Sequence, residues 1–139
     1  MAATLMDYFN RQPRIGVLVT SSREGRVDCA VIGSARMLNE ETVVVALGKN
    51  RSLAYLEENP HAVYAILEPG KGIMDWKGIR VYLRAKEIAT SGMPLEEYKK
   101  QIANAIGEEA AKMIHAVVTF GVYEVRPIVD MGQGWEKSI

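Results

Sequence analysis

Residues 47–60, LGKNRSLAYLEENP, combine a glycine, two cations, an amide and a hydroxyl directly before a short amphipathic segment. Unpaired N–H groups at a helix start and the positive end of the helix dipole bind phosphate well. Arg51 adds a planar fork suited to phosphate oxygens, Ser52 a hydroxyl and Lys49 a mobile point charge. This stretch therefore predicts a phosphate-bearing ligand held where a strand turns into a helix.

A second interpretation of the same residues needs no ligand. Ser52 or Asn50 could serve only as the N-cap of a surface helix, because both residue types cap helices well. Lys49 and Arg51 would then extend into solvent. Local sequence leaves both interpretations open.

Two common nucleotide-binding loops are excluded. Gly48-Lys49 is not the end of a Walker A loop, because Val43 occupies the position of the first glycine and Asn50 that of the Ser or Thr. No strand is followed by Gly-x-Gly-x-x-Gly, and residues 69–72 (PGKG) are typical of an ordinary loop.

The chain also lacks the usual residues of a metal site or a nucleophilic centre. His61 and His115 lie far apart in sequence, with no Cys or carboxylate at ligand spacing, so we predict no metal. Cys29 lies in an apolar stretch and is expected to be a small core residue. No catalytic residue is identified, which favours a bound cofactor as the source of any chemistry.

Composition limits the classes of partner. The 139 residues are 48% hydrophobic and 24% charged, which predicts a single folded domain over residues 1–139. Lys plus Arg and Asp plus Glu both number 17, so the formal net charge is zero. This balance gives no support for binding nucleic acid or an anionic membrane.

The single cysteine, Cys29, excludes an intramolecular disulfide and fits a reducing compartment. The first residues lack the order of a signal peptide, and no apolar run is long enough to span a bilayer. We therefore expect a cytoplasmic protein.

The elements that position the phosphate turn are mostly strands. Apolar and alternating stretches predict strands at residues 15–20, 26–32, 42–47, 62–67, 79–86 and 116–125. Helices are expected at 4–12, after the phosphate turn, and from Pro94 to Met113 with Gly107 as a break. Gly121 is a candidate bulge or bend. Hairpin connections make the strands antiparallel, so we predict a mainly β fold: a small six-stranded barrel with two or three flanking helices.

The segment from Arg51 to Pro60 resembles the K-T-x-x-N-L-x-x-N-P signature of the pyridoxamine 5′-phosphate oxidase-like, FMN-binding split-barrel family. In that family the Lys or Arg and the Thr or Ser that open the helix bind the FMN phosphate. Arg51 and Ser52 stand at these positions, whereas Tyr55 replaces the usual Asn. The order of predicted elements extends the resemblance over nearly the whole chain and implies a split barrel.

The resemblance implies further cofactor contacts. The strand that runs along the isoalloxazine ring in the family corresponds here to Ala30, Val31, Ile32, Gly33 and Ser34. Val31 and Ile32 could instead be ordinary core residues, but a glycine within a strand permits close approach of a ligand. Lys71, Trp76 and Lys77, in and after a second loop, are candidates for the ring edge or the phosphate. Their alternatives are solvated cations and a packed aromatic residue.

Members of the family are homodimers with each flavin between the subunits, so a partner chain is expected to complete the pocket. Residues 131–136 (MGQGWE) are glycine-rich and carry Trp135. We expect Trp135 to pack at the dimer interface or over the partner's flavin pocket; a loose tail is the alternative.

The resemblance implies an FMN-binding flavoprotein, either an oxidoreductase that uses NAD(P)H or an electron carrier without a dedicated substrate. A different class remains open: a non-catalytic split-barrel module that binds haem, deazaflavin or a pyridoxal-type ligand.

Overall fold

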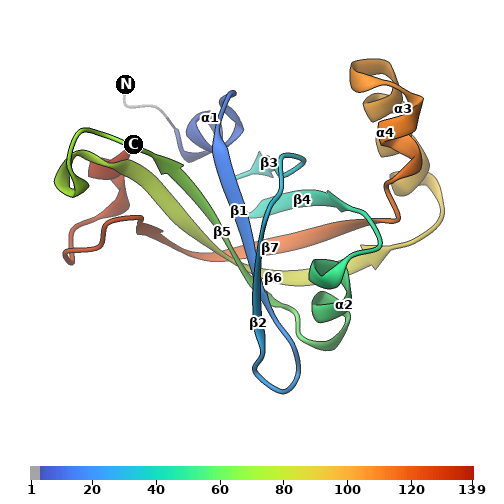
Figure 1. Ribbon diagram of the computed structural model, residues 1–139, viewed down its shortest axis with the longest axis horizontal. Helices are drawn as coiled ribbons and strands as arrows, with labels where there is room; N and C mark the ends of the chain where they lie inside the picture. Colours follow the sequence, from blue (N-terminus) through green and yellow to red (C-terminus); the bar gives the residue numbers. More distant parts are fainter. Residues whose placement is uncertain (1–3) are drawn as a thin grey trace.

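The strands predicted from apolar patterning join into one antiparallel sheet, which the computed structural model describes over residues 4–139 (Figure 1). In this range the strands are β1 Ile15–Ser21, β2 Val27–Val31, β3 Arg36–Asn39, β4 Thr42–Leu47, β5 His61–Glu68, β6 Lys77–Ala89 and β7 Ala116–Pro127. The α-helices are α1 Leu5–Asn10, α2 Arg51–Glu58, α3 Met93–Ile106 and α4 Glu108–Lys112. Two short 3₁₀ helices, η1 Ile73–Asp75 and η2 Trp135–Ser138, complete the described elements.

The sheet is open, with strand order β2-β1-β5-β6-β7-β4-β3. Edge strands β2 and β3 do not pair with each other within residues 4–139, so the predicted barrel is not closed. The strand count is also corrected from six to seven. In Figure 1 the β1–β2 hairpin runs across the long strands β6 and β7 and extends beyond them.

One face of the sheet covers the hydrophobic core. Along β6, Ile79, Val81 and Leu83 are fully buried, which confirms the predicted alternation. Helix α1 contributes Phe9, and α2 contributes Leu53 and Leu56, to the same cluster. The inner face and these helices therefore form a single core.

Strand β3 is the element that patterning missed. It has four residues, and only Met37 is buried. Asn10, at the end of α1, bonds the backbone of this strand. Its side chain donates to the carbonyl of Met37 and accepts from the N–H of Met37, both at 2.8 Å. A long-range contact, rather than a local pattern, stabilises this short strand.

Gly107 separates α3 from α4, as predicted, and its φ of 104° is a conformation that glycine adopts without strain. The expected irregularity at Gly121 lies nearby instead. Gly121 pairs regularly with Arg84 and with Thr42, whereas the β6–β7 ladder shifts register on either side of it.

The prediction that Cys29 is a core residue is wrong, because its side chain is exposed on β2. Val27 and Val31, on the same face of β2, are also exposed. The apolar pattern of this strand therefore marks an uncovered surface.

No helix within residues 4–139 is both long enough and apolar enough to cross a lipid bilayer.

Candidate functional site

The predicted phosphate turn forms the start of α2. The side chain of Asn50 caps the helix by accepting from the N–H of Leu53 at 3.0 Å. The first i to i−4 bond runs from Ala54 N–H to the carbonyl of Asn50 at 3.1 Å. The N–H groups of Arg51 and Ser52 precede that bond and have no partner inside the helix. These two groups are the donors that an anion at this turn would meet.

The side chains at the turn fall into two kinds. Lys49 and Arg51 are exposed, whereas Ser52 is buried to 2% exposure at the base of the helix. Asn50 is occupied as the cap, as the ligand-free interpretation expected. Capping by Asn50 and an anion-binding helix start are compatible, because the cap uses only the N–H of Leu53.

The strand predicted to run along a flavin ring lies beside this turn. The guanidinium of Arg51 lies 4.0 Å from the carboxylate of Asp28 on β2. Farther along, the Ser34 hydroxyl donates to the carbonyl of Ala46 at 2.6 Å and accepts from its N–H at 3.2 Å. Because Ala46 is near the end of β4, directly before the turn, these contacts bring residues 30–34 next to residues 49–52.

Three side chains that patterning did not single out hold the backbone of residues 32–35. Tyr64 donates to the carbonyl of Ile32 at 2.5 Å, and Tyr98 on α3 donates to that of Ser34 at 2.8 Å. Arg14 donates to the carbonyls of Gly33, at 3.2 Å, and of Ala35. No local pattern marks these residues, because each contact joins segments at least 19 positions apart.

Burial raises the pKa of both tyrosines. The positive charge of Arg14, near Tyr64, and the charges of Arg36 and Arg14, near Tyr98, only partly offset this effect. Their hydroxyls therefore stay protonated at neutral pH and act as donors. The segment is thus fixed by neutral hydrogen bonds and by one guanidinium.

The surface of this segment is open toward solvent. A Cβ at Gly33 would meet no atom within 4 Å, and the Val31 side chain is exposed. Ala30 and Ile32 are half-buried, and Ile32 packs against the core, as the core interpretation expected for it. A flat ligand could therefore approach the backbone at Gly33 closely.

Lys71 and Trp76 do not join this cluster within the same chain. Strand β5 begins at His61, just after α2, and its last residue, Glu68, pairs with Lys77 at the far end. Eight residues of strand span about 23 Å. The loop with Lys71 and Trp76 follows that far end, and Figure 1 shows it on the opposite side of the molecule from α2.

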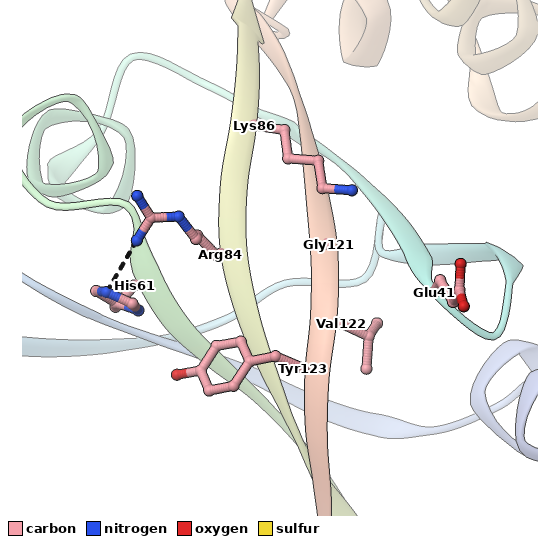
Figure 2. Close-up of a pocket in the computed structure, with 7 residues that line it drawn as sticks. All are labelled: Glu41, His61, Arg84, Lys86, Gly121, Val122 and Tyr123. Atoms are coloured by element: carbon pink, nitrogen blue, oxygen red, sulfur yellow. Dashed lines mark hydrogen bonds between the residues drawn. The ribbon is translucent and has the colours of Figure 1, made fainter.

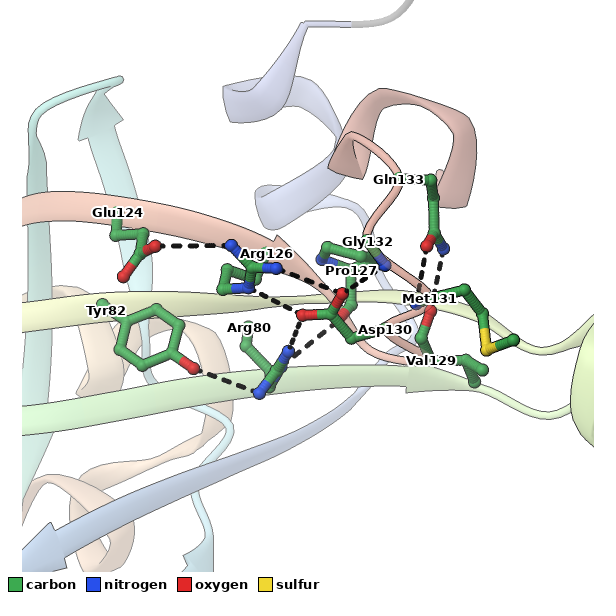
Figure 3. A network of polar contacts seen from close by, with 10 residues as sticks. All are labelled: Arg80, Tyr82, Glu124, Arg126, Pro127, Val129, Asp130, Met131, Gly132 and Gln133. Atoms are coloured by element: carbon green, nitrogen blue, oxygen red, sulfur yellow. Dashed lines mark hydrogen bonds and ion pairs between the residues drawn. The ribbon is translucent and has the colours of Figure 1, made fainter.

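The C-terminal tail is held by a polar network (Figure 3). Asp130 accepts from Arg80 and from Arg126, both at 2.6 Å, and from the N–H of Gly132 at 2.9 Å. The hydrogen bond from Arg126, followed by that from Gly132, lowers the pKa of Asp130 to about 2. The carboxylate therefore remains charged throughout the physiological range.

The tail beyond this network forms a 3₁₀ helix that packs against the core, which excludes the alternative of a loose tail. Trp135 opens η2, is half-buried and packs against the core of its own chain, together with Ile139. Its predicted contact with a partner chain remains a prediction.

Histidine, cysteine and carboxylate side chains do not cluster into a metal site anywhere in residues 4–139. His61 begins β5 and His115 precedes β7, so the two histidines lie at the starts of different strands. The candidate site thus consists of the start of α2, with backbone N–H donors that have no partner inside the helix, beside the exposed strand β2.

Comparison with known proteins identifies the fold. No protein-family model and no curated protein matches the chain. Among solved structures, an FMN-binding protein from Syntrophomonas wolfei superposes with a TM-score of 0.74 at 22% identity, covering 88% of this chain and 82% of that one. HupZ from Group A Streptococcus gives a TM-score of 0.72 at 19% identity, with 92% and 94% covered. HutZ, the heme storage protein from Vibrio cholerae, gives 0.65 at 18% identity, with 90% and 94% covered.

The chain has the split-barrel fold of these proteins. The sheet of this chain has seven strands and is not closed. At 18 to 22% identity the likeness establishes the fold alone. The ligand must be argued from the residues of this chain.

Proposed function

We propose that this chain is a single-domain, cytoplasmic, FMN-binding flavoprotein that acts as a homodimer. The observation that carries the proposal is the meeting of two features at one place: the unpaired donors at the start of α2 and the open strand at residues 30–33. A ligand that carries a phosphate at a fixed distance from a flat ring would use the donors for its phosphate and the open strand for its ring. The FMN-binding protein of the same fold supports a flavin ligand.

The residues present fit the proposed group by their donor chemistry. Arg51 and the N–H groups at the helix start would hold the phosphate, with Ser52 supplying a hydroxyl. The exposed backbone near Gly33 would contact the ring, and Tyr64 would keep that backbone in place. A bound flavin supplies hydride or electron transfer; the protein orients it and excludes water.

The oxidoreductase part of the proposal is tested by turnover. We expect the protein with stoichiometric FMN to oxidise NADH or NADPH at least tenfold faster than the same concentration of free FMN. A stopped-flow or absorbance assay under anaerobic conditions, with an added electron acceptor, measures this rate. A rate equal to that of free FMN would reject the reductase and leave an electron carrier.

The outer face of three strands, exposed on β2 and half-buried on β1 and β5, supports the homodimer. Val31 and Cys29 on β2 pair with Val17 and Val19 on β1, and these in turn pair with Ala65 and Val63 on β5. Residues directly opposite in an antiparallel sheet share a face, so these side chains form one continuous apolar surface. Such a surface is typical of a protein interface.

Val27→Asp tests this surface, because Val27 is 75% exposed on the same face of β2. A charge there would be buried without a partner in a dimer but solvated in a monomer. We expect sedimentation to show a shift from twice the chain mass to the chain mass. Met113→Asp, at a residue 76% exposed on the helical end, is the matched control and should leave the mass unchanged. Equal masses for wild type and Val27→Asp would contradict the proposed interface.

A haem-binding module is the second candidate, favoured by the shared fold with HutZ. Haem would leave the phosphate donors at α2 without a role. The two candidates therefore differ in whether Arg51 and Ser52 contribute to affinity.

A further inference from the structure

A pocket of about 350 Å³ lies on the outer face of the sheet where β5, β6 and β7 meet (Figure 2). Its lining residues are Glu41, His61, Arg84, Lys86, Gly121, Val122 and Tyr123. None of them belongs to the phosphate turn or to residues 30–34. The pocket therefore shares no residue with the candidate flavin site, and His61 lies on the same face of β5 as Val63 and Ala65.

Two bulges in the β6–β7 ladder shape this pocket. Tyr82 pairs with Glu124 and Leu83 with Val122, so Tyr123 is an extra residue on β7. Ala85 pairs with Phe120 and Glu87 with Thr119, so Lys86 is an extra residue on β6. A bulge changes the direction of its side chain, and bulges are frequent beside functional sites. Both bulged residues line the same pocket.

Gly121 provides the space in which Lys86 lies. A Cβ on Gly121 would be 2.5 Å from Cε of Lys86 and 3.1 Å from its Nζ. The lysine chain thus lies across the glycine, as Figure 2 shows, with its ammonium over β7. Any larger residue at this position would displace the ammonium group.

Arg84 is held by a hydrogen bond to a histidine ring rather than by a carboxylate. Its Nη1 lies 3.2 Å from Nε2 of His61, and because a guanidinium only donates, Nε2 accepts. The His61 ring in turn packs edge-on against Tyr123, with ring centroids 6.0 Å apart and planes at 85°. This contact fixes the Arg84 side chain without compensating its charge.

The pocket has an excess of positive charge. Within residues 4–139, neither Arg84 nor Lys86 has a carboxylate within 4.0 Å. Glu41 is the single carboxylate that lines the pocket, against these two cations. An anion would therefore gain from both cations.

We propose that this pocket binds a nucleoside monophosphate through its phosphate group. A planar guanidinium beside an ammonium point charge suits phosphate oxygens, and the exposed Tyr123 ring offers a face for a base. The volume is within the range of small-ligand sites. Arg84 and Lys86 bind the phosphate, and Tyr123 contacts the base.

The test is a residue-resolved NMR titration of the full-length protein with AMP, inorganic phosphate and adenosine. We expect AMP to shift the amide signals of Arg84, Lys86 and Val122 in a saturable way. Phosphate should shift the same signals more weakly, and adenosine should not shift them. An equal response to adenosine and AMP, or no saturable shift with AMP or with phosphate, would overturn the proposal.

Variants separate the pocket from the phosphate turn. Arg84→Gln and Lys86→Gln should each weaken AMP at least tenfold, as loss of one charge-assisted hydrogen bond implies. Gly121→Ala should act in the same direction, because it displaces the Lys86 ammonium but keeps its charge. Lys100→Gln, at an exposed lysine on α3, is the matched control and should leave the affinity unchanged.

Arg51→Ala tests whether the pocket binds AMP independently of the phosphate turn. The response of Arg84 and Lys86 to AMP should persist in this variant, whereas any response at the start of α2 should fall. Loss of the Arg84 and Lys86 response in Arg51→Ala would show that the pocket has no anion site of its own. The flavin proposal would be unaffected by that result.

Discussion

The double variant Arg51→Ala, Ser52→Ala is expected to bind FMN about a hundredfold more weakly than the wild type and riboflavin almost equally well. Charge-assisted hydrogen bonds contribute about 1.5–3 kcal/mol each. Arg51 is 69% exposed, so solvent reduces its contribution and two such bonds together should contribute about 3 kcal/mol. Riboflavin lacks the phosphate and should not depend on either side chain.

Fluorescence titration of both flavins with both proteins measures the four affinities. Glu57→Ala, at an exposed residue on the same helix, is the control for general effects on α2 and should change neither affinity. If FMN and riboflavin weaken by the same factor, the start of α2 does not hold the phosphate.

Gly16→Ala is expected to lower the free energy of unfolding by about 3 kcal/mol, the upper end of the range for overpacking a core. A Cβ at Gly16 would lie 1.9 Å from the hydroxyl oxygen of Tyr64 and 2.5 Å from its Cζ. Tyr64 is fully buried and packs against Phe9, with ring centroids 5.2 Å apart. The ring therefore has no free space into which it could move.

Gly16→Ala should also weaken flavin binding at the candidate site. Tyr64 passes over Gly16 to donate to the carbonyl of Ile32, so displacing its ring breaks the bond that fixes residues 32–35. Urea denaturation measures the stability, and flavin titration of the folded fraction measures the site. Gly72→Ala, where a Cβ meets no atom within 4 Å, should alter neither. A Gly16→Ala protein as stable as Gly72→Ala would contradict the described packing.

The parts of the fold that follow from local pattern were predictable from the sequence. The alternation at residues 79–86 gives one buried face of β6 because side chains alternate across a strand. Gly107 ends α3 because it adopts a positive φ without strain. These features depend only on neighbouring residues.

The features that patterning missed depend on distant contacts or on what covers a surface. Met37 is the single buried residue of β3, and Asn10 fixes that strand from another element. Cys29 was predicted to be buried because its strand is apolar. A pattern shows that a strand is apolar but not whether another element of the same chain covers it.

The candidate site also has one part that the local sequence predicts and one part that depends on distant contacts. A short motif was enough to single out Arg51 and Ser52, because a helix start uses adjacent residues. The nearness of residues 30–34 to that turn rests on Ser34 bonding Ala46 and on Tyr98 reaching Ser34 from α3. Only the folded chain reveals these contacts.

The central claim, that the chain binds FMN, is tested most directly by the absorbance spectrum of the purified protein and the mass of any released ligand. We predict flavin bands and the mass of FMN, or, for protein purified without ligand, stoichiometric binding of added FMN at micromolar concentration. A colourless protein that binds no FMN at that concentration, or one with haem bands, would contradict the claim.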